Sequence, residues 1–360
     1  MSTGYKYDTL YQELKEDLIE LSPGDSFPAV RTIMKEHAVS QATVTMATER
    51  LFNEGLLLKA VGKGMMVTEE VLKYKKGAKP IICLAIPHWQ SEWNAIIEHK
   101  FHDMRELLGY ELEVLHYDWH EKVPLALPQA KVDGLVVVPS ASLISVDEIG
   151  ILDGLHVPYV LFARHLSGMA VNCISSDNRH CGAIAANHLI ELGHKRIAVI
   201  ISQPRFETIA ERVDGFRTMC ELRSVECVEV DCGVTDGDLA AEKVYMQFKQ
   251  LLDEKKLDFS GAMTMCQPSC MAIYRALYEY GMRIPDDFSV IGVGNASIFE
   301  YLHPPLTTVA TPIDKMVSNT VQIIFSELDE LLNGKGIVQN QIKPVLVERQ
   351  STTTFKGEQS

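Results

Sequence analysis

The run His188-Leu189-Ile190-Glu191-Leu192-Gly193-His194-Lys195-Arg196-Ile197 decides the fold of most of this chain. It ends a helical pattern that begins near His180, stops at Gly193, and leads into the apolar strand pattern Ile197–Ser202. Helical and strand patterns alternate in the same way from Pro80 onward. Such alternation predicts an α/β fold with parallel sheets that bind ligands at the carboxyl ends of their strands. Further strands are expected at Ile81–Ile86, Tyr110–Tyr117, Asp133–Ser140, Pro158–Ala163 and Phe288–Val293, and a further helix at Glu92–Leu108.

Composition narrows the class of protein. A chain of 360 residues exceeds the roughly 100–200 residues of a typical domain, so two or more domains are expected. Hydrophobic residues make up 46% and charged residues 23%, which excludes a disordered, collagen-like or disulfide-scaffold chain. The apolar runs are far shorter than the roughly 20 residues of a membrane-spanning helix, and Met1–Leu10 lacks the apolar core of a signal peptide. We therefore expect a cytoplasmic protein without a membrane partner, whose eight cysteines are reduced thiols.

The net charge of −14 is distributed unevenly. Residues 1–76 hold ten Lys or Arg and eleven Asp or Glu, so nearly all of the acidic excess lies in the rest of the chain. This distribution argues against nonspecific nucleic-acid binding by the whole surface. It is compatible with local DNA contacts from the almost neutral amino-terminal part.

The first 70 residues follow another order of elements. Ser40 is a favourable N-cap for a helix, and Gly55 is the expected stop after that helix. Two helical patterns precede it and two strand patterns follow, which is the order of a winged helix-turn-helix. The expected helices are Tyr5–Glu20, Pro28–His37 and Ser40–Asn53, and the expected strands are Leu56–Ala60 and Met65–Thr68.

Motifs at separate places in this region occur in order and at matching spacing, and together they resemble the GntR-type DNA-binding domain. The resemblance covers about residues 5–68. The motifs are Pro23-Gly24-Asp25, Phe27-Pro28, Arg31, Val39-Ser40, Thr43-Val44, Ala47, Arg50-Leu51, Glu54-Gly55-Leu56 and Gly62-Lys63-Gly64.

The resemblance implies that the helix after Ser40 enters the major groove of DNA. Gln41 suits an adenine edge, Ser40 and Thr43 suit phosphates, and Lys63 between two glycines suits the minor groove. Arg31 resembles the family position that reaches the DNA backbone or a guanine, while an ion pair with Glu36 or Glu49 is the structural alternative. Arginines usual in the family are replaced by Gln41 and Thr45, which lowers the number of phosphate contacts. The candidate DNA-binding residues are Arg31, Ser40, Gln41, Thr43, Thr45, Lys63 and Gly64.

The remainder of the chain resembles the LacI-type effector domain, which is similar to periplasmic sugar-binding proteins. The resemblance implies two lobes, each a parallel sheet flanked by helices, with the chain crossing between them near Asn172–Ser175, Pro304–Thr308 and Gly336–Gln339. We therefore expect a winged helix-turn-helix at 1–70, a linker at 71–79 and a ligand-binding domain at 80–352. Lobe 1 would comprise about 80–173 and 306–336, and lobe 2 about 174–305 and 337–352. The motifs are Val132-Asp133-Gly134-Leu135, Ser176-Asp177-Asn178, His188–Ile197, Glu211–Phe216, Ile284–Gly292 and Pro305–Val309.

Candidate ligand contacts follow the strand ends. By resemblance, Arg212 grips ligand from the second lobe, against a salt bridge with Asp214 or Glu211 as the alternative. The tryptophans suit stacking on a sugar ring or simple packing, and Ser140 suits either ligand or the cap of a turn. Acids and amides usual in sugar-binding members are replaced here by Ala163, Cys266-Gln267 and Gly294-Asn295, which leaves an anionic ligand open beside a sugar. The candidate ligand-binding residues are Trp89, Trp93, Ser140, Arg164, Arg212, Gln267 and Asn295.

No catalytic, metal-binding or nucleotide-binding motif occurs in the sequence, so we expect no enzyme activity and no cofactor. The two domains together predict a ligand-responsive repressor of carbohydrate uptake or catabolism genes. It would bind palindromic operator DNA as a homodimer, with a small-molecule effector between the two lobes. Two alternatives remain, a small-molecule binding protein without operator binding, and a regulator that responds to an anionic ligand.

Overall fold

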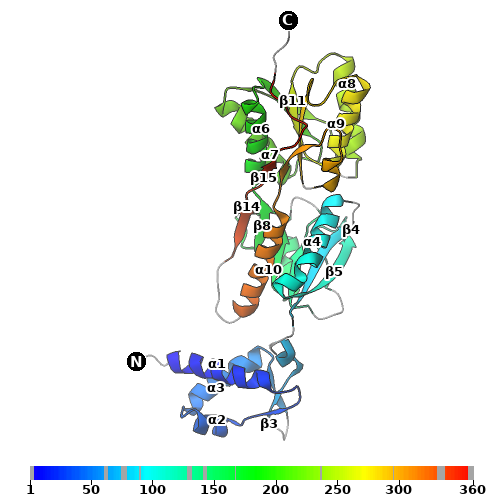
Figure 1. The fold of residues 1–360 in the computed structure, drawn as a ribbon. Helices are drawn as coiled ribbons and strands as arrows, with labels where there is room; N and C mark the ends of the chain where they lie inside the picture. The colour runs from blue at the N-terminus through cyan, green and yellow to red at the C-terminus, as the bar shows by residue number, and fades with distance from the viewer. Residues whose placement is uncertain are drawn as a thin grey trace. The chain divides into compact units, whose positions relative to one another are not determined.

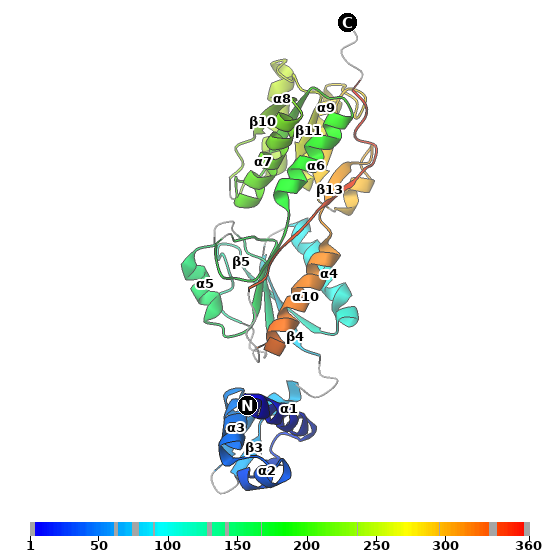
Figure 2. The same cartoon turned by 90° about the vertical axis from the view of Figure 1, so that its left-hand side faces the viewer.

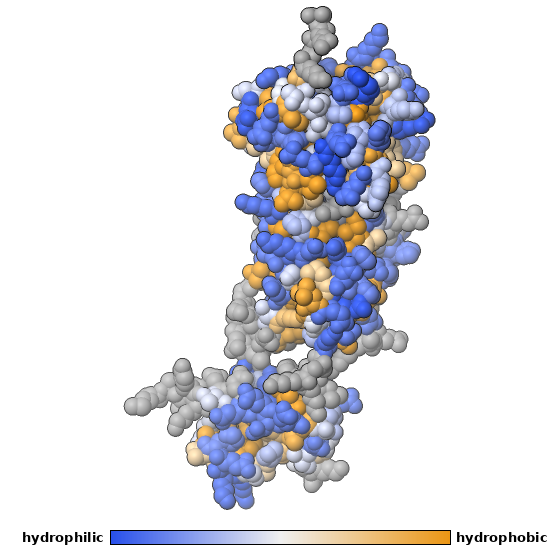
Figure 3. All heavy atoms as spheres, in the orientation of Figure 1, coloured by the Kyte–Doolittle hydropathy of each residue, from blue (hydrophilic) through white to orange (hydrophobic). Residues whose placement is uncertain are grey.

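The computed structural model divides the chain into two compact units, Met1–Pro80 and Ile81–Ser360, here called the head and the body. It describes residues 4–60, 64–73, 79–88, 91–127, 132–140, 144–166, 168–235, 237–294, 296–330 and 337–355. Within these ranges, no helix combines the length and the apolar character needed to cross a membrane. On the face shown in Figure 3, hydrophilic side chains predominate and hydrophobic ones gather in separate patches.

The head is a winged helix-turn-helix, as the order of its elements predicts (Figure 1). Three antiparallel strands in the order β1-β3-β2 form a small sheet, in which the two-residue β1 was not predicted. Gly55 takes a φ of +70° after α3, which suits its predicted role as the stop of that helix. The elements are α1 (Gly4–Glu20), β1 (Ser26–Phe27), α2 (Val30–Glu36), α3 (Gln41–Asn53), β2 (Leu57–Ala60), β3 (Gly64–Val67) and the 3₁₀ helix η1 (Glu69–Lys73).

The head's core forms where α1 packs on α3. Leu14 and Leu18 of α1 are fully buried with Val44 and Leu51 of α3. Val71 of η1 is also fully buried, so the head extends beyond residue 70 into the segment expected to be linker.

The first lobe of the body is built on a six-stranded parallel sheet in the order β14-β8-β7-β6-β4-β5. Alternate side chains of β4 enter two cores, one under α4 and α10 and the other beside α5. This explains the continuous apolar run in β4, because a strand covered on both faces is apolar throughout. The elements are β4 (Ile81–His88), α4 (Glu92–Leu108), β5 (Glu111–Asp118), β6 (Gly134–Val137), α5 (Val146–Asp153), β7 (Tyr159–Phe162), β8 (Cys173–Ser176), α10 (Ile313–Glu330) and β14 (Gln339–Ile342).

The second lobe repeats this plan with the strand order β10-β9-β11-β12-β13-β15, in which β15 alone runs antiparallel. Helices α6 and α7 cover one face of the sheet, and α8 and α9 cover the other. The elements are α6 (Asn178–Glu191), β9 (Arg196–Ile201), α7 (Glu207–Leu222), β10 (Glu226–Asp231), α8 (Ala240–Asp253), β11 (Gly261–Thr264), α9 (Gln267–Glu279), β12 (Ser289–Val293), the 3₁₀ helix η2 (Ser297–Glu300), β13 (Thr307–Ala310) and β15 (Val345–Val347).

Three chain segments join the two lobes (Figure 2). β8 and β14 are hydrogen-bonded in the first sheet, whereas β13 lies in the second. The crossings therefore follow Ser176, Ala310 and Ile342, a few residues later than the sequence indicated. The difference arises because each strand continues to the edge of its sheet before the chain leaves the lobe.

Helices α6 and α7 approach closely at two glycines. A Cβ at Gly182 would meet the carbonyl oxygen of Arg212 and lie 2.7 Å from the backbone nitrogen of Phe216. A Cβ at Gly215 would likewise meet the backbone of Arg179 on α6. The obstacles are backbone atoms, so no side chain can rotate away to make room. The two glycines therefore set the distance between α6 and α7.

The close approach predicts the effect of adding a methyl group. Gly182→Ala is expected to lower the free energy of unfolding of the body by at least about 2 kcal/mol, because the helices must separate. Gly150→Ala is the matched control, since nothing lies within 4 Å of its Cβ position on α5. It should leave stability unchanged or raise it by about 0.5–1 kcal/mol. Urea unfolding of the full chain measures both, and equal effects of the two substitutions would contradict this account.

Two buried histidines fasten the carboxyl-terminal segment to the second lobe. His194 Nδ1 lies 2.6 Å from Ser260 Oγ and its Nε2 lies 3.1 Å from Ser289 Oγ. His188 Nε2 lies 2.9 Å from Thr352 Oγ1, and the His194 ring is 5.4 Å from that of Phe355. Burial lowers the pKa of both histidines below the ordinary value of 6.5. The folded state therefore favours their neutral forms.

This shift predicts that acid weakens the body. The unfolded state binds more protons below pH 6.5, so the free energy of unfolding falls as pH drops from 6.5 toward the lowered pKa values. His194→Gln should reduce this slope in urea unfolding measured between about pH 7.5 and 5.5. The same substitution at the exposed His99 on α4 is the matched control. A slope identical in all three proteins would show that the buried histidine does not cause it.

Candidate ligand cleft and nucleic-acid interface

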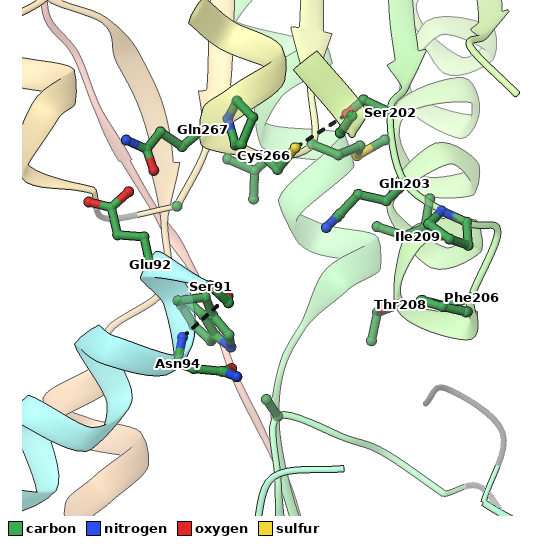
Figure 4. Close-up of a pocket in the computed structure, with 18 of the residues that line it drawn as sticks. Ser91, Glu92, Asn94, Ser202, Gln203, Phe206, Thr208, Ile209, Cys266 and Gln267 are labelled. Carbon is green, nitrogen blue, oxygen red and sulfur yellow. Dashed lines mark hydrogen bonds between the residues drawn. The ribbon is translucent and has the colours of Figure 1, made fainter. Parts of the chain in front are cut away.

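A cleft of about 550 Å³ lies between the two lobes of the body (Figure 4). It is lined from the first lobe by residues that follow β4, β6 and β7, and from the second by residues that follow β9, β11 and β12. The carboxyl ends of both parallel sheets thus face the same space. This is the place where open α/β sheets bind ligands.

The structure brings five of the seven predicted ligand residues to this cleft, namely Trp93, Ser140, Arg164, Arg212 and Gln267. The other two, Trp89 and Asn295, lie outside the residues that the structure describes. Trp93 is half-buried and also packs against the core of the first lobe. The Ser140 hydroxyl donates to the carbonyl of Glu121 at 2.6 Å, which is the turn-capping alternative.

Arg164 is held over the strand ends of the first lobe. Ala163, which follows β7 and precedes Arg164, takes a left-handed φ of +61°. Its Nη1 donates to the carbonyl of Ala163 at 3.1 Å and its Nη2 to that of Pro139 at 3.4 Å. Burial lowers the pKa of Arg164 to about 10, so the guanidinium remains charged at neutral pH.

Arg212 projects into the cleft from α7 and is fixed by a neighbour on α6. Its Nε donates to Asn178 Oδ1 at 3.0 Å, and Asn178 Nδ2 donates to Glu211 Oε2 at 3.3 Å. Asp214 is engaged instead with Arg179 and Arg217. Among the described residues, neither alternative ion pair of Arg212 forms and its Nη atoms donate to no other residue. These two groups therefore remain directed to a ligand or to solvent.

Sequence reasoning missed Glu92, the first residue of α4, which lines the cleft. Burial raises the pKa of its carboxyl, and its Oε2 is buried without a partner among the described residues. Figure 4 shows this carboxyl and the amide of Gln267 pointing toward one another from opposite lobes. The only indication in the sequence was its place just after a strand.

Further polar groups complete the lining, and they also escaped sequence reasoning. Cys266 stands where the family resemblance implies an asparagine, and its Sγ lies 3.3 Å from Ser269 Oγ and 3.8 Å from Ser202 Oγ. The additional residues with polar side chains that Figure 4 labels are Ser91, Asn94, Gln203 and Thr208. Within the described ranges, no three His, Cys, Asp or Glu side chains are placed to hold a metal ion. The cleft therefore offers hydrogen bonds and charge to a ligand.

The candidate DNA-contacting residues lie on α2, α3 and β3 of the head. Gln41 is exposed at the start of α3 and Thr45 is half-buried one turn later. Arg31 on α2 is exposed and, within the described part of the chain, forms no ion pair with Glu36 or Glu49.

The wing and the start of α3 place the remaining candidates. Gly64 is exposed with a φ of +79°, and Lys63 lies outside the described residues. Ser40 and Thr43 contact each other, because Ser40 Oγ accepts from the Thr43 backbone at 3.2 Å and lies 2.8 Å from its Oγ1. Ser40 therefore caps α3, as the sequence predicted.

Behind this surface, charged groups fix α3 to α1. Glu54 Oε1 accepts from the hydroxyl of Tyr11 at 2.6 Å, and its Oε2 lies 3.1 Å from the Nζ of the buried Lys15. Arg50 lies 3.5 Å from Glu54 and stacks on the Tyr11 ring, with its guanidinium carbon 4.1 Å from the ring centre. Arg50 thus stabilises the packing of α3 on α1.

The capping geometry gives a prediction for the head. Ser40→Ala removes the acceptor for the Thr43 amide and should lower the stability of α3 by about 1 kcal/mol. Gln41→Ala, at the exposed next position, should change stability by less than about 0.5 kcal/mol. Hydrogen exchange of the α3 amides in the full chain measures both. Unchanged exchange in the Ser40 variant would rule out a capping role.

Comparisons with known proteins give one family match in the head and another in the body. Residues 6–67 match the model of the gntR family of bacterial regulatory proteins, and residues 186–352 match that of the periplasmic binding protein-like domain. The chain therefore joins a domain similar to the gntR family of bacterial regulatory proteins to a domain similar to periplasmic binding proteins.

Individual relatives carry names of this class. The HTH-type transcriptional regulator reg1 of Streptomyces lividans is 28% identical over 58% of this chain and 59% of that protein, so this chain spans less than two thirds of its length. The arabinose metabolism transcriptional repressor of Halalkalibacterium halodurans is 22% identical over 98% of both chains. A LacI family regulator from Enterococcus faecium, solved with bound ribose, superposes with a TM-score of 0.64 at 22% identity, over 77% of this chain and all of that one. The last likeness concerns the fold.

Proposed function

We propose that the protein is a cytoplasmic, ligand-responsive repressor whose head binds operator DNA and whose body binds a small-molecule effector. The observation that carries this proposal is the combination, in one chain, of an exposed helix-turn-helix surface and a cleft lined by polar groups from two lobes. Regulation of sugar uptake or catabolism genes is supported by the name of a relative that matches along nearly its whole length.

The head carries the side chains that would contact DNA. An α-helix fits the major groove, and the exposed side chain of Gln41 at the start of α3 carries the donor and acceptor pair that an adenine edge requires. Arg31 on the preceding helix is exposed for a phosphate or a guanine. The almost neutral head limits the number of phosphate contacts, so we expect a modest dependence of affinity on salt.

Binding to DNA requires two heads, because one small domain contacts too few base pairs for specificity in a genome. We propose that the body forms a homodimer, which would match a palindromic operator. Helices α8 and α9 pack against each other and expose Met246, Met271 and Tyr278, with 58%, 46% and 76% of their surfaces accessible. Exposed apolar side chains of this size on neighbouring helices support a subunit contact there.

The body would make DNA binding depend on the effector. A ligand that contacts residues of both lobes favours the arrangement in which those contacts coexist. This preference regulates DNA binding only when the two arrangements differ in their affinity for the operator. Residues such as Gln267 and Arg212 in one lobe and Glu92 and Arg164 in the other give an effector partners on both sides.

Operator binding is the decisive test. The purified full chain should shift its own upstream DNA in the presence of excess competitor DNA, more weakly at 0.2 M than at 0.05 M salt. Arg31→Ala should weaken binding about tenfold and reduce the salt slope by about one, because one cationic contact is lost. Arg223→Ala removes an exposed arginine at the end of α7, away from the proposed subunit contact, and should have no effect.

Other outcomes separate the alternatives. A protein that stays monomeric at micromolar concentration and never shifts palindromic upstream DNA, with or without added sugars and anions, would contradict the proposed function. Ligand binding in the cleft without any DNA binding would favour a small-molecule binding protein instead.

A further inference from the structure

We propose that the effector of this cleft carries an anionic group, a carboxylate or a phosphate on a sugar-sized molecule, bound jointly by Arg164 of the first lobe and Arg212 of the second. The inference rests on the proposed function, since it specifies the ligand of the same cleft. It differs from the neutral sugar that the resemblance favours, and the difference comes from residues of this chain.

The two guanidinium groups come from opposite sides of the cleft. Arg164 follows β7 in the first lobe, Arg212 lies on α7 in the second, and both line the same space. They are close enough to interact electrostatically. After burial, which is the main cause of the lowered pKa of Arg164, the charge of Arg212 lowers it further while Tyr117 and Glu207 raise it. An anion placed between two like charges is attracted by both, whereas a neutral sugar gains only hydrogen bonds.

Both guanidinium groups are held in place before a ligand arrives. Arg164 is fixed by the carbonyls of Ala163 and Pro139, and Arg212 by the side-chain oxygen of Asn178. A fixed guanidinium loses little conformational entropy when it binds an anion, and its planar donors match carboxylate and phosphate oxygens. The two Nη groups of Arg212 donate to no other residue in the described part of the chain. They supply a fork for two anionic oxygens.

Neither carboxyl group of the described lining, Asp238 or Glu92, forms an ion pair with Arg164 or Arg212. Asp238 is turned to its own neighbours, with its Oδ2 2.7 Å from Thr235 Oγ1 and 3.1 Å from Lys243 Nζ. The carboxyl of Glu92, whose pKa burial raises, points toward the amide of Gln267 on the opposite lobe. Ala163 stands where the resemblance implies an aspartate that would accept sugar hydroxyls. The lining thus lacks an acceptor that neutral sugars use and carries cations in its place.

The rest of the cleft suits the uncharged part of such a ligand. Trp93 lines the cleft with an aromatic ring, and Asn94 and Gln203 line it with amide groups. Groups of this kind bind sugar hydroxyls without adding charge. The chemistry indicated is a polyhydroxylated molecule with one acidic group.

Matched pairs of ligands test the charge. Isothermal titration calorimetry of the full chain should compare D-galacturonate with D-galactose, D-glucose 6-phosphate with D-glucose, and inorganic phosphate alone. We expect one charged sugar to bind at least tenfold more tightly than its neutral partner, with an affinity that falls as salt rises. The carboxylate and phosphate pairs identify which acidic group is preferred. Tighter binding of a neutral sugar, or no binding by either charged sugar, would overturn the proposal.

Variants assign the effect to the two arginines. Arg164→Gln and Arg212→Gln should each weaken the charged sugar at least tenfold, while Arg205→Gln, an exposed arginine paired with Asp231 and Glu229 outside the lining, should leave affinity unchanged. Because Arg164 also bridges two strand ends, Arg164→Lys provides a second variant that keeps the charge. It should retain more affinity than Arg164→Gln at equal thermal stability. Full affinity in both glutamine variants would contradict the assignment.

Operator binding by the same preparations keeps the two proposals distinguishable. A chain that shifts operator DNA but binds only neutral sugars retains the proposed function and loses the anionic effector. A chain that binds the charged sugar but shifts no operator DNA retains the anionic ligand and loses the proposed function.

Discussion

The backbone contact between α6 and α7 is the constraint on which the cleft depends. Gly182 and Gly215 let the two helices approach until backbone meets backbone. That distance places Arg212 of α7 against Asn178 at the start of α6, and it also sets where α7 begins beside the cleft. The direction of a ligand-facing cation is thus determined by two residues that touch no ligand. The packing of helices in the second lobe therefore determines the geometry of a charged group in the cleft.

The elements that sequence predicted well are those fixed by local interactions. The helix expected at Glu92–Leu108 has those bounds in the structure, because Ser91 caps its start and Gly109 takes a left-handed conformation at its end. The crossings were placed less well because they depend on pairing between distant segments. β14 joins β8 across more than 160 residues, and nothing in either tetrapeptide indicates its partner. The two-residue β1 exists only through its pairing with β3.

The residues of the candidate site were likewise predicted only in part. Position after a strand, together with a family resemblance, identified three residues that line the cleft, Arg164, Arg212 and Gln267. The same rule does not separate polar residues that face the cleft from those that face solvent, so Glu92 and Gln203 were missed. Their direction depends on the opposite lobe, which the local sequence does not describe. Where two interpretations of a residue stood side by side, hydrogen-bond geometry favours one, as it does for the hydroxyl of Ser140.

The placement of the two cleft arginines bears on how a ligand acts as a signal. Each guanidinium is held by its own lobe, Arg164 by carbonyls of the first and Arg212 by an amide of the second. A ligand that contacts one lobe alone binds every arrangement of the lobes equally and therefore shifts no equilibrium. A ligand group attracted to both cations gains most when both are near it. Its free energy of binding then depends on the distance between the lobes. Because of this dependence, ligand binding changes the arrangement of the lobes and can affect other parts of the protein.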